Sequence, residues 1–160
     1  MRTPEIILRN SARCPQCGDE IESRHRHDFR FCRCGAMGVD GGHEYIRRIG
    51  AFGENTSIVA TRELDDPEAT AAALDFMDRF RSGWRPSMSD YADAPRLDSW
   101  ITHTAVVGRS RVPVLIGTVT SHPDYADATL VATTHLLAIH GREKWARTTR
   151  RYYRLGERQR

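Results

Sequence analysis

The sequence predicts an α+β protein of two modules: a small zinc ribbon, followed by an amphipathic helix packed on an antiparallel sheet of about four strands. Three observations carry this prediction. All four cysteines fall within residues 14–34. A helical pattern of apolar residues follows an Asp-Pro-Glu sequence that begins at residue 66, and segments rich in Val, Ile, Thr and aromatic residues follow that helix. We therefore expect a zinc-ribbon module at residues 1–62 and a helix-plus-sheet domain at residues 63–160.

The metal prediction rests on the spacing of the cysteines. Cys14 and Cys17 form a C-x2-C pair, Cys32 and Cys34 form a C-x-C pair, and fourteen residues separate the two pairs. Each pair can direct two thiolates at one ion, so two pairs complete a tetrahedral Zn²⁺ site. A glycine follows both Cys17 and Cys34, and glycine suits turns that need positive φ. We expect one structural Zn²⁺ ion held by these four cysteines.

Disulfide bonds, a redox pair and unrelated thiols are the alternatives to a metal. Cytosolic chains rarely keep disulfides, and residues 1–10 lack the pattern of a secretory signal. A catalytic C-x-x-C pair is expected beside a βαβ pattern, and unrelated thiols do not pair at such short spacing. His25 and His27 could replace a cysteine as ligands. Because four thiolates already complete the shell, we expect these histidines beside the site or on the surface.

Residues 12–50 contain the cysteine pairs, the run IESRHRHDF, a C-x-C-G motif and a VDGG segment. With these motifs the stretch resembles an uncharacterised four-cysteine zinc-ribbon family found mostly in phage and prophage proteins. The resemblance implies four-cysteine metal binding and a phage or prophage origin. It implies no activity.

The helix and strands of the second module follow from local signals. Asp66 is a candidate N-cap, with Pro67 in the first helical position and Glu68 in the first turn. Apolar residues then recur at helical spacing and are expected to face the core: Ala73, Leu74, Phe76, Met77, Phe80 and Trp84. Ser87 with Asp90 predicts one further helical turn. The expected strands are residues 100–107, 112–120, 129–140 and 145–153.

Residues 73–156 carry the motifs GWRPS, APRLDSW, GTVTSHP and WARTTRRYYRLG. These motifs resemble those of a short uncharacterised bacterial protein family, and this resemblance also implies no activity. The chain therefore looks like a fusion of two modules.

Charge is distributed unevenly, although the formal net charge is only +3. Residues 63–100 hold nine acidic residues against four arginines, whereas residues 142–160 hold eight basic residues against two acidic ones. Arginines interleaved with aromatic residues are typical of surfaces that bind nucleic acid. The candidates are Arg24, Arg26 and Arg30 in the cysteine spacer, and Trp145, Arg147, Arg150, Arg151, Tyr153 and Arg154 near the end of the sequence. Alternatively, the later arginines cover aromatic rings and pair with the acidic helix.

The patterns together favour a zinc-binding protein that binds nucleic acid, DNA or RNA, or acts as a regulator. The alternative is an interaction module that docks on a bacterial or phage protein. A third hypothesis is an enzyme that uses the loop at His122, for which no catalytic residue is assigned. No run approaches eighteen apolar residues, so we expect no membrane partner and a cytoplasmic location, in the host cytoplasm if the protein is phage-encoded.

Overall fold

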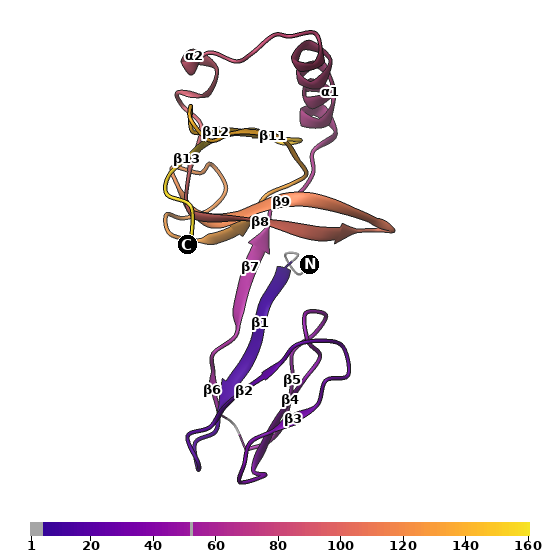
Figure 1. Cartoon of the computed structure of the whole chain (residues 1–160), viewed down its shortest axis with the longest axis vertical. Helices are drawn as coiled ribbons and strands as arrows, with labels where there is room; N and C mark the ends of the chain where they lie inside the picture. Colours follow the sequence, from indigo (N-terminus) through magenta and orange to yellow (C-terminus); the bar gives the residue numbers. More distant parts are fainter. Residues whose placement is uncertain (1–4, 52) are drawn as a thin grey trace. The chain divides into compact units, whose positions relative to one another are not determined.

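The computed structural model describes residues 5–51 and 53–160; residues 1–4 of the expected zinc-ribbon module and Phe52 lie outside the described residues. The chain divides into two compact units, residues 5–60 (the N-terminal unit) and residues 61–160 (the C-terminal unit). Strands make up 45% of the described residues and helices 12%. The predicted α+β class with a four-stranded sheet is therefore wrong, because the protein is mostly β (Figure 1).

The N-terminal unit is built from short strands. They are β1 (Glu5–Arg13), β2 (Glu20–Ser23), β3 (Arg30–Phe31), β4 (Met37–Asp40), β5 (Arg47–Gly50) and β6 (Glu54–Asn55). β1 pairs antiparallel with β2 and with β6, and β3, β4 and β5 form a separate three-stranded antiparallel sheet. The buried core is small and contains two of the cysteines: Ala12, Cys14, Cys32, Met37 and Val39.

A buried asparagine ties β1 to the turn after β4. The Asn10 side-chain amide donates to the carbonyl oxygens of Asp40, Gly42 and Tyr45 at 3.0, 3.0 and 2.9 Å. Gly42 has a φ of 54°, and a Cβ atom there would lie 2.3 Å from the His25 backbone. This close approach explains why the VDGG segment needs glycine at residue 42.

The remaining elements begin with β7, which crosses the boundary between the two units at residues 60 and 61, and the others belong to the C-terminal unit. They are β7 (Ile58–Arg62), α1 (Pro67–Arg81), α2 (Met88–Tyr91), β8 (Arg96–Val107), β9 (Ser110–Thr120), β10 (Leu130–Ala132), β11 (Leu136–His140), β12 (Trp145–Thr148) and β13 (Tyr152–Leu155). Hydrogen bonds link ten strands of the described chain in the order β11-β12-β13-β8-β9-β10-β7-β1-β2, with β6 paired to β1. The sheet is mixed, because β7 with β10 and β8 with β13 are parallel pairs. The expectation of a purely antiparallel sheet is therefore also wrong.

Two of the expected strands are interrupted. The segment at residues 129–140 contains β10 and β11, and the segment at residues 145–153 contains β12 and the start of β13. The Thr148 hydroxyl accepts hydrogen bonds from the backbone amides of Arg150 and Arg151, both at 3.2 Å, which closes a turn. β12 and β13 then pair as an antiparallel hairpin. The side chains from residue 145 to residue 153 consequently do not alternate along a single strand.

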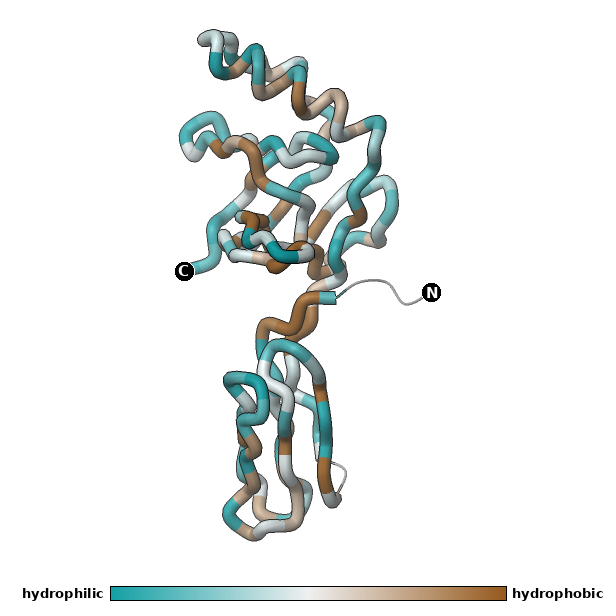
Figure 2. Tube along the Cα trace, turned by 90° about the vertical axis from the view of Figure 1, so that its right-hand side faces the viewer, coloured by the Kyte–Doolittle hydropathy of each residue, from teal (hydrophilic) through white to brown (hydrophobic). Residues whose placement is uncertain are grey.

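The predicted helix signals are confirmed. The Asp66 carboxylate accepts a hydrogen bond from the Glu68 amide at 3.0 Å, and Pro67 opens α1. α2 begins with a capping box of Ser87 and Asp90. Both hydrophilic and hydrophobic residues occur along the length of α1 (Figure 2). One detail of the core prediction is wrong, since Leu74 is 64% exposed.

The C-terminal unit buries two apolar clusters. One lies along the sheet and contains Leu97, Leu115, Val119, Val131, Tyr153 and Leu155. The other joins α1 and α2 to β12 through Phe76, Tyr91 and Trp145. The Phe76 and Trp145 rings meet edge to face with centroids 6.4 Å apart, an arrangement that stabilises aromatic pairs.

Candidate metal centre

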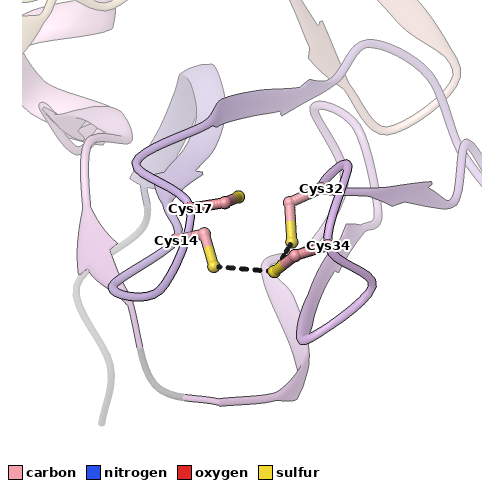
Figure 3. Close-up of side chains that lie close together, drawn as sticks. All are labelled: Cys14, Cys17, Cys32 and Cys34. Atoms are coloured by element: carbon pink, nitrogen blue, oxygen red, sulfur yellow. Dashed lines mark hydrogen bonds between the residues drawn. The ribbon is translucent and has the colours of Figure 1, made fainter.

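The four cysteines converge at one end of the N-terminal unit. Cys14 and Cys17 lie in the loop after β1, and Cys32 and Cys34 lie in the facing loop after β3 (Figure 3). All four sulfur atoms lie within 4.8 Å of one another. The Sγ atoms of Cys14 and Cys34 are 3.7 Å apart, and those of Cys32 and Cys34 are 3.5 Å apart. The predicted ligands are thus brought together, and the group could hold a metal ion.

These separations fit a shared ion. With metal–sulfur bonds of about 2.3 Å, two thiolates at adjacent corners of a tetrahedron lie about 3.8 Å apart. A disulfide requires about 2.05 Å between sulfur atoms, which is well below the observed separations. The four cysteines are accordingly free thiols in the structure.

Two tight turns position the sulfur atoms. The Gly18 amide donates to the Cys14 carbonyl at 3.0 Å, and the Gly35 amide donates to the Cys32 carbonyl at 2.9 Å. Gly18 and Gly35 have φ values of 72° and 74°, so both turns use the left-handed conformation that glycine adopts freely. Each glycine therefore closes the loop that presents its cysteine pair.

Backbone amides favour the thiolate form at several of the sulfurs. A hydrogen bond from the Asp19 backbone is the main reason that the pKa of Cys17 is lowered. Burial opposes ionisation of Cys32, but hydrogen bonds from the Met37 backbone and the neighbouring thiols lower its pKa to about 6. Amide hydrogen bonds to sulfur are a common second layer around metal-binding cysteines.

Cys34 retains its proton most strongly. The Ala36 backbone favours its thiolate, but the hydrogen bond with Cys32 and burial outweigh that effect and raise the pKa of Cys34 to about 12. Four adjacent thiols cannot all ionise together without a cation, because each new negative charge opposes the next. A bound metal ion supplies that cation and displaces the remaining protons.

The two histidines of the spacer stand apart from the cysteine cluster. His25 is an exposed side chain whose Nε2 lies 3.9 Å from an Asp28 carboxylate oxygen. His27 has a φ of 61°, and its Nδ1 lies 3.5 Å from the Tyr45 hydroxyl. Among the described residues, the metal-ligating group comprises only the four cysteines.

The spacer arginines lie on the surface and pair with acidic neighbours. Arg24 lies 3.7 Å from Glu22, Arg26 lies 3.3 Å from Glu44, and Arg30 lies 2.8 Å from the buried Asp28. Exposed ion pairs contribute about 0–1 kcal/mol, so Arg24 and Arg26 can exchange these partners for another anion at little cost.

An exposed aromatic pair flanks Arg30 in the sequence. Phe29 and Phe31 are 45% and 54% exposed, and their rings are nearly parallel with centroids 6.4 Å apart. The Arg47 guanidinium lies 5.8 Å from the centre of the Phe29 ring. This pair was not predicted, although the run Asp-Phe-Arg-Phe carried a signal: two aromatic residues two positions apart in an extended segment share one face.

The candidate residues of the C-terminal unit mostly have partners inside the fold. Arg150 donates to the Leu64 carbonyl at 2.7 Å, Arg151 pairs with Glu63 at 2.6 Å, and Arg154 donates to the Ala94 carbonyl at 2.7 Å. Trp145 and Tyr153 are core residues with 1% and 0% of their surface exposed. Their rings are enclosed by other side chains and present no face to a stacking base.

Arg147 is the exception among these arginines. It is 7% exposed, and its guanidinium faces the Tyr152 and Phe76 rings at 5.1 and 5.7 Å. Its Nε atom is buried without a hydrogen-bond partner among the described residues. Burial of the charged guanidinium lowers the pKa of Arg147.

Comparison with protein families gives two matches. Residues 77–159, just over half of the chain, match the model described as a family of unknown function (DUF6634). The chain belongs to the DUF6634 family. Residues 6–50 match a separate domain of unknown function (DUF7695). The chain therefore combines two domains, and the function of each is unknown. Comparisons with curated proteins and with solved structures find no match.

The DUF6634 part also contains a buried polar network centred on His122. The Asp124 amide donates to His122 Nδ1 at 3.0 Å, so Nε2 carries the proton and faces the Tyr153 hydroxyl at 3.1 Å. The Tyr153 hydroxyl in turn donates to the Glu63 carboxylate, which precedes the matched region. Both nitrogens of His122 are therefore engaged, which gives this histidine a role in holding its loop.

Glu63 is the charged centre of that network. Burial opposes its ionisation, but hydrogen bonds from His122 and Tyr153 and the charge of Arg151 lower the pKa of Glu63 below its usual value. No local pattern indicates this role, because Glu63 lies in a turn-like acidic stretch far from its partners in the chain.

The structure also bears on the expectation about membranes. Within residues 5–51 and 53–160, neither helix has the length and apolar character that a membrane crossing requires.

Proposed function

We propose that the N-terminal unit is folded around one structural Zn²⁺ ion held by Cys14, Cys17, Cys32 and Cys34. The sulfur separations of 3.5 and 3.7 Å support this assignment. Four thiolates would fill the tetrahedral shell and leave no open position for a substrate, which favours a structural ion over a catalytic one. Soft thiolate ligands also favour zinc over magnesium or calcium.

We further propose that this zinc-supported unit binds single-stranded nucleic acid on the aromatic surface, defined as Phe29, Phe31 and Arg47 with the neighbouring Arg24 and Arg30. The exposed, parallel pair of phenylalanine rings is the observation that carries the proposal. Every base has a flat face that can stack on such rings, and stacking contributes about 1–3 kcal/mol per base. The arginines supply contacts to the phosphates.

The charge balance of the N-terminal unit determines how strongly we expect it to bind nucleic acid. Residues 5–60 contain eight arginines and eight acidic residues, so long-range attraction of a nucleic acid is weak. With about three arginines contacting phosphates, the logarithm of the binding constant should fall with a slope of about −2 against the logarithm of salt concentration. Stacking, and not net charge, is then the main source of affinity.

The test measures fluorescence anisotropy of labelled single- and double-stranded DNA and RNA with zinc-loaded protein across a salt series. Changing Phe29 and Phe31 to alanine together should weaken single-strand binding at least about tenfold. Ile58→Ala removes a similarly exposed apolar side chain outside the aromatic surface and serves as the matched control. Unchanged binding by the double phenylalanine variant would exclude this surface as the binding site.

A second candidate function is docking on a bacterial or phage protein. Phe29, Phe31 and Ile46 are all exposed apolar side chains of the N-terminal unit, and such side chains are enriched at protein interfaces. The phage or prophage origin and the cytoplasmic location stay predictions with this proposal. Co-purification of a specific partner that depends on both phenylalanines, with no nucleic-acid binding in the anisotropy assay, would favour docking.

A further inference from the structure

The C-terminal unit contains a surface groove of about 550 Å³ that the proposed function does not use. Residues near α2, the His122 loop and the β12–β13 hairpin line it, among them Asp90, Asp93, Pro123, Arg147, Arg151 and Tyr152. We refer to it as the Arg147 groove. It lies wholly within residues 61–160 and is far in sequence from the cysteine cluster.

Arg147 stands out within this groove because its charge has no anionic partner in the part of the chain that the structure describes. Arg151, which also lines the groove, is paired with both Glu63 and Asp124. Arg147 is buried to a similar or greater degree, yet its Nε atom has no acceptor among the described residues. Its neighbours at the guanidinium are the faces of Phe76 and Tyr152. Buried charges in proteins are ordinarily paired, so an unpaired guanidinium in a groove indicates a missing anion.

The surroundings restrict the charge of that anion. Asp90 and Asp93 also line the groove and disfavour an anion with several negative charges. The Asp90 carboxylate is fixed by the Ser87 amide at 2.7 Å, and the Arg151 charge is already neutralised by its two partners. Arg147 is then the guanidinium of the groove that has no anionic partner among the described residues, and a ligand with one negative charge would match it.

We propose that the Arg147 groove binds a small organic monocarboxylate, with Arg147 as the principal binding residue. A guanidinium offers two parallel N–H donors that match the two oxygens of a carboxylate. The apolar walls of the groove at Ala94, Pro95, Pro123 and the Tyr152 ring accommodate the hydrocarbon part of the ligand. This site is independent of the zinc ion and of the aromatic surface, so its failure leaves the proposed function untouched.

The experiment is an NMR titration of the ¹⁵N-labelled, zinc-loaded full chain with sodium acetate, sodium benzoate and sodium phosphate. The Arg147 Nε–H resonance should shift saturably with both carboxylates, and benzoate should bind more tightly than acetate because its ring contacts the apolar walls. Arg147→Gln should weaken benzoate binding at least about tenfold. Arg150→Gln removes a neighbouring arginine outside the groove and should leave the affinity unchanged.

Two further variants keep the test decisive. Arg147→Lys keeps the positive charge but loses the paired donors, so it should bind benzoate with intermediate affinity. Ser89→Trp should fill the groove from its exposed rim and block binding while Arg147 stays in place.

The proposal is overturned if no residue of the groove shows a saturable shift. It is also overturned if a folded Arg147→Gln or Ser89→Trp protein binds benzoate as tightly as the parent. Tighter binding of phosphate than of both carboxylates would contradict the monocarboxylate assignment.

Discussion

The two units of this chain are stabilised in different ways. Among its described residues, the buried apolar cluster of the N-terminal unit has five members, two of them cysteines, and the largest of these side chains is Met37. The C-terminal unit instead encloses Trp145 and Tyr153 almost completely, with further aromatic and aliphatic side chains around them. A unit with so little apolar surface to bury depends on a metal ion or another crosslink. We therefore expect removal of the proposed zinc ion to unfold the first unit and to leave the second unit folded.

Loss of one thiolate should have the largest effect and should act on the N-terminal unit alone. Cys14→Ser, or chelation of the metal, should unfold the N-terminal unit, because zinc binding of about 10–16 kcal/mol is also the folding energy of such modules. Zinc stoichiometry by native mass spectrometry and amide dispersion by NMR measure the effect. Resonances of residues 61–160 should stay in place. Retained zinc together with unchanged thermal melting would show that the cysteines do not form the metal centre.

A substitution in the aromatic cluster should instead destabilise the C-terminal unit and leave the N-terminal unit folded. Trp145→Ala should lower the free energy of unfolding of this unit by about 3–5 kcal/mol, because it leaves a large cavity. Chemical denaturation followed by fluorescence of the remaining tryptophans measures the loss, and zinc content should be unaffected. Leu74→Ala is the matched control: its side chain is 64% exposed, and the expected change is within about 0.5 kcal/mol. Similar losses in both variants would contradict the assigned core.

A third change tests the buried network at Glu63. Glu63→Gln removes the charge that faces Arg151 and should destabilise the C-terminal unit by about 3 kcal/mol, because the partly buried Arg151 guanidinium loses the nearer and more deeply buried of its two counter-charges. Urea midpoints at neutral pH give the measurement. Arg150 is more exposed than Glu63 and serves as the comparison. Arg150→Gln should lower the free energy of unfolding much less than Glu63→Gln does.

The same network predicts a pH dependence with a defined sign. The pKa of Glu63 is lowered in the folded protein from an ordinary value of 4.5. Its stabilising contribution is therefore complete above pH 4.5 and is lost as the pH falls through the lower, folded-state pKa. The difference in unfolding free energy between the parent protein and Glu63→Gln should shrink over that acidic range. A difference that is constant down to the acid transition would contradict this account.

The smallest expected effect concerns the helix start. Asp66→Ala removes the acceptor for the Glu68 amide and should cost the C-terminal unit about 1 kcal/mol. Thermal melting measures the shift. Asp75→Ala changes an exposed acidic residue within the same helix and should have little effect. If both substitutions behave alike, the cap contributes nothing beyond its charge.

Features that depend on a few neighbouring residues were predictable from the sequence. The spacing of Cys14, Cys17, Cys32 and Cys34 identified the cluster that the structure brings together, and Asp66 with Pro67 identified the start of α1. Such signals work because a turn or a cap is decided within a few residues.

Features that depend on distant partners were not predictable. The parallel pairing of β13 with β8 is decided by hydrogen bonds between remote segments, for which the sequence has no local marker. Arg147, Arg151 and Tyr153 form a basic, aromatic pattern in the sequence, but the break in the strand at Thr148 and the partner Glu63 direct them into the fold. Composition alone cannot distinguish such a cluster from a binding surface, because both use the same side chains.

The position of β13 in the sheet has a consequence for biosynthesis. β13 lies between β12 and β8, although it follows every other described strand in the chain. The hairpin of β8 and β9 and the hairpin of β11 and β12 can each form early, because their strands are close in sequence. They cannot join into one sheet until Tyr152–Leu155 has left the ribosome. Until then the facing edges of β8 and β12 are unpaired, and the nascent chain is open to wrong pairing and to chaperone binding at those edges.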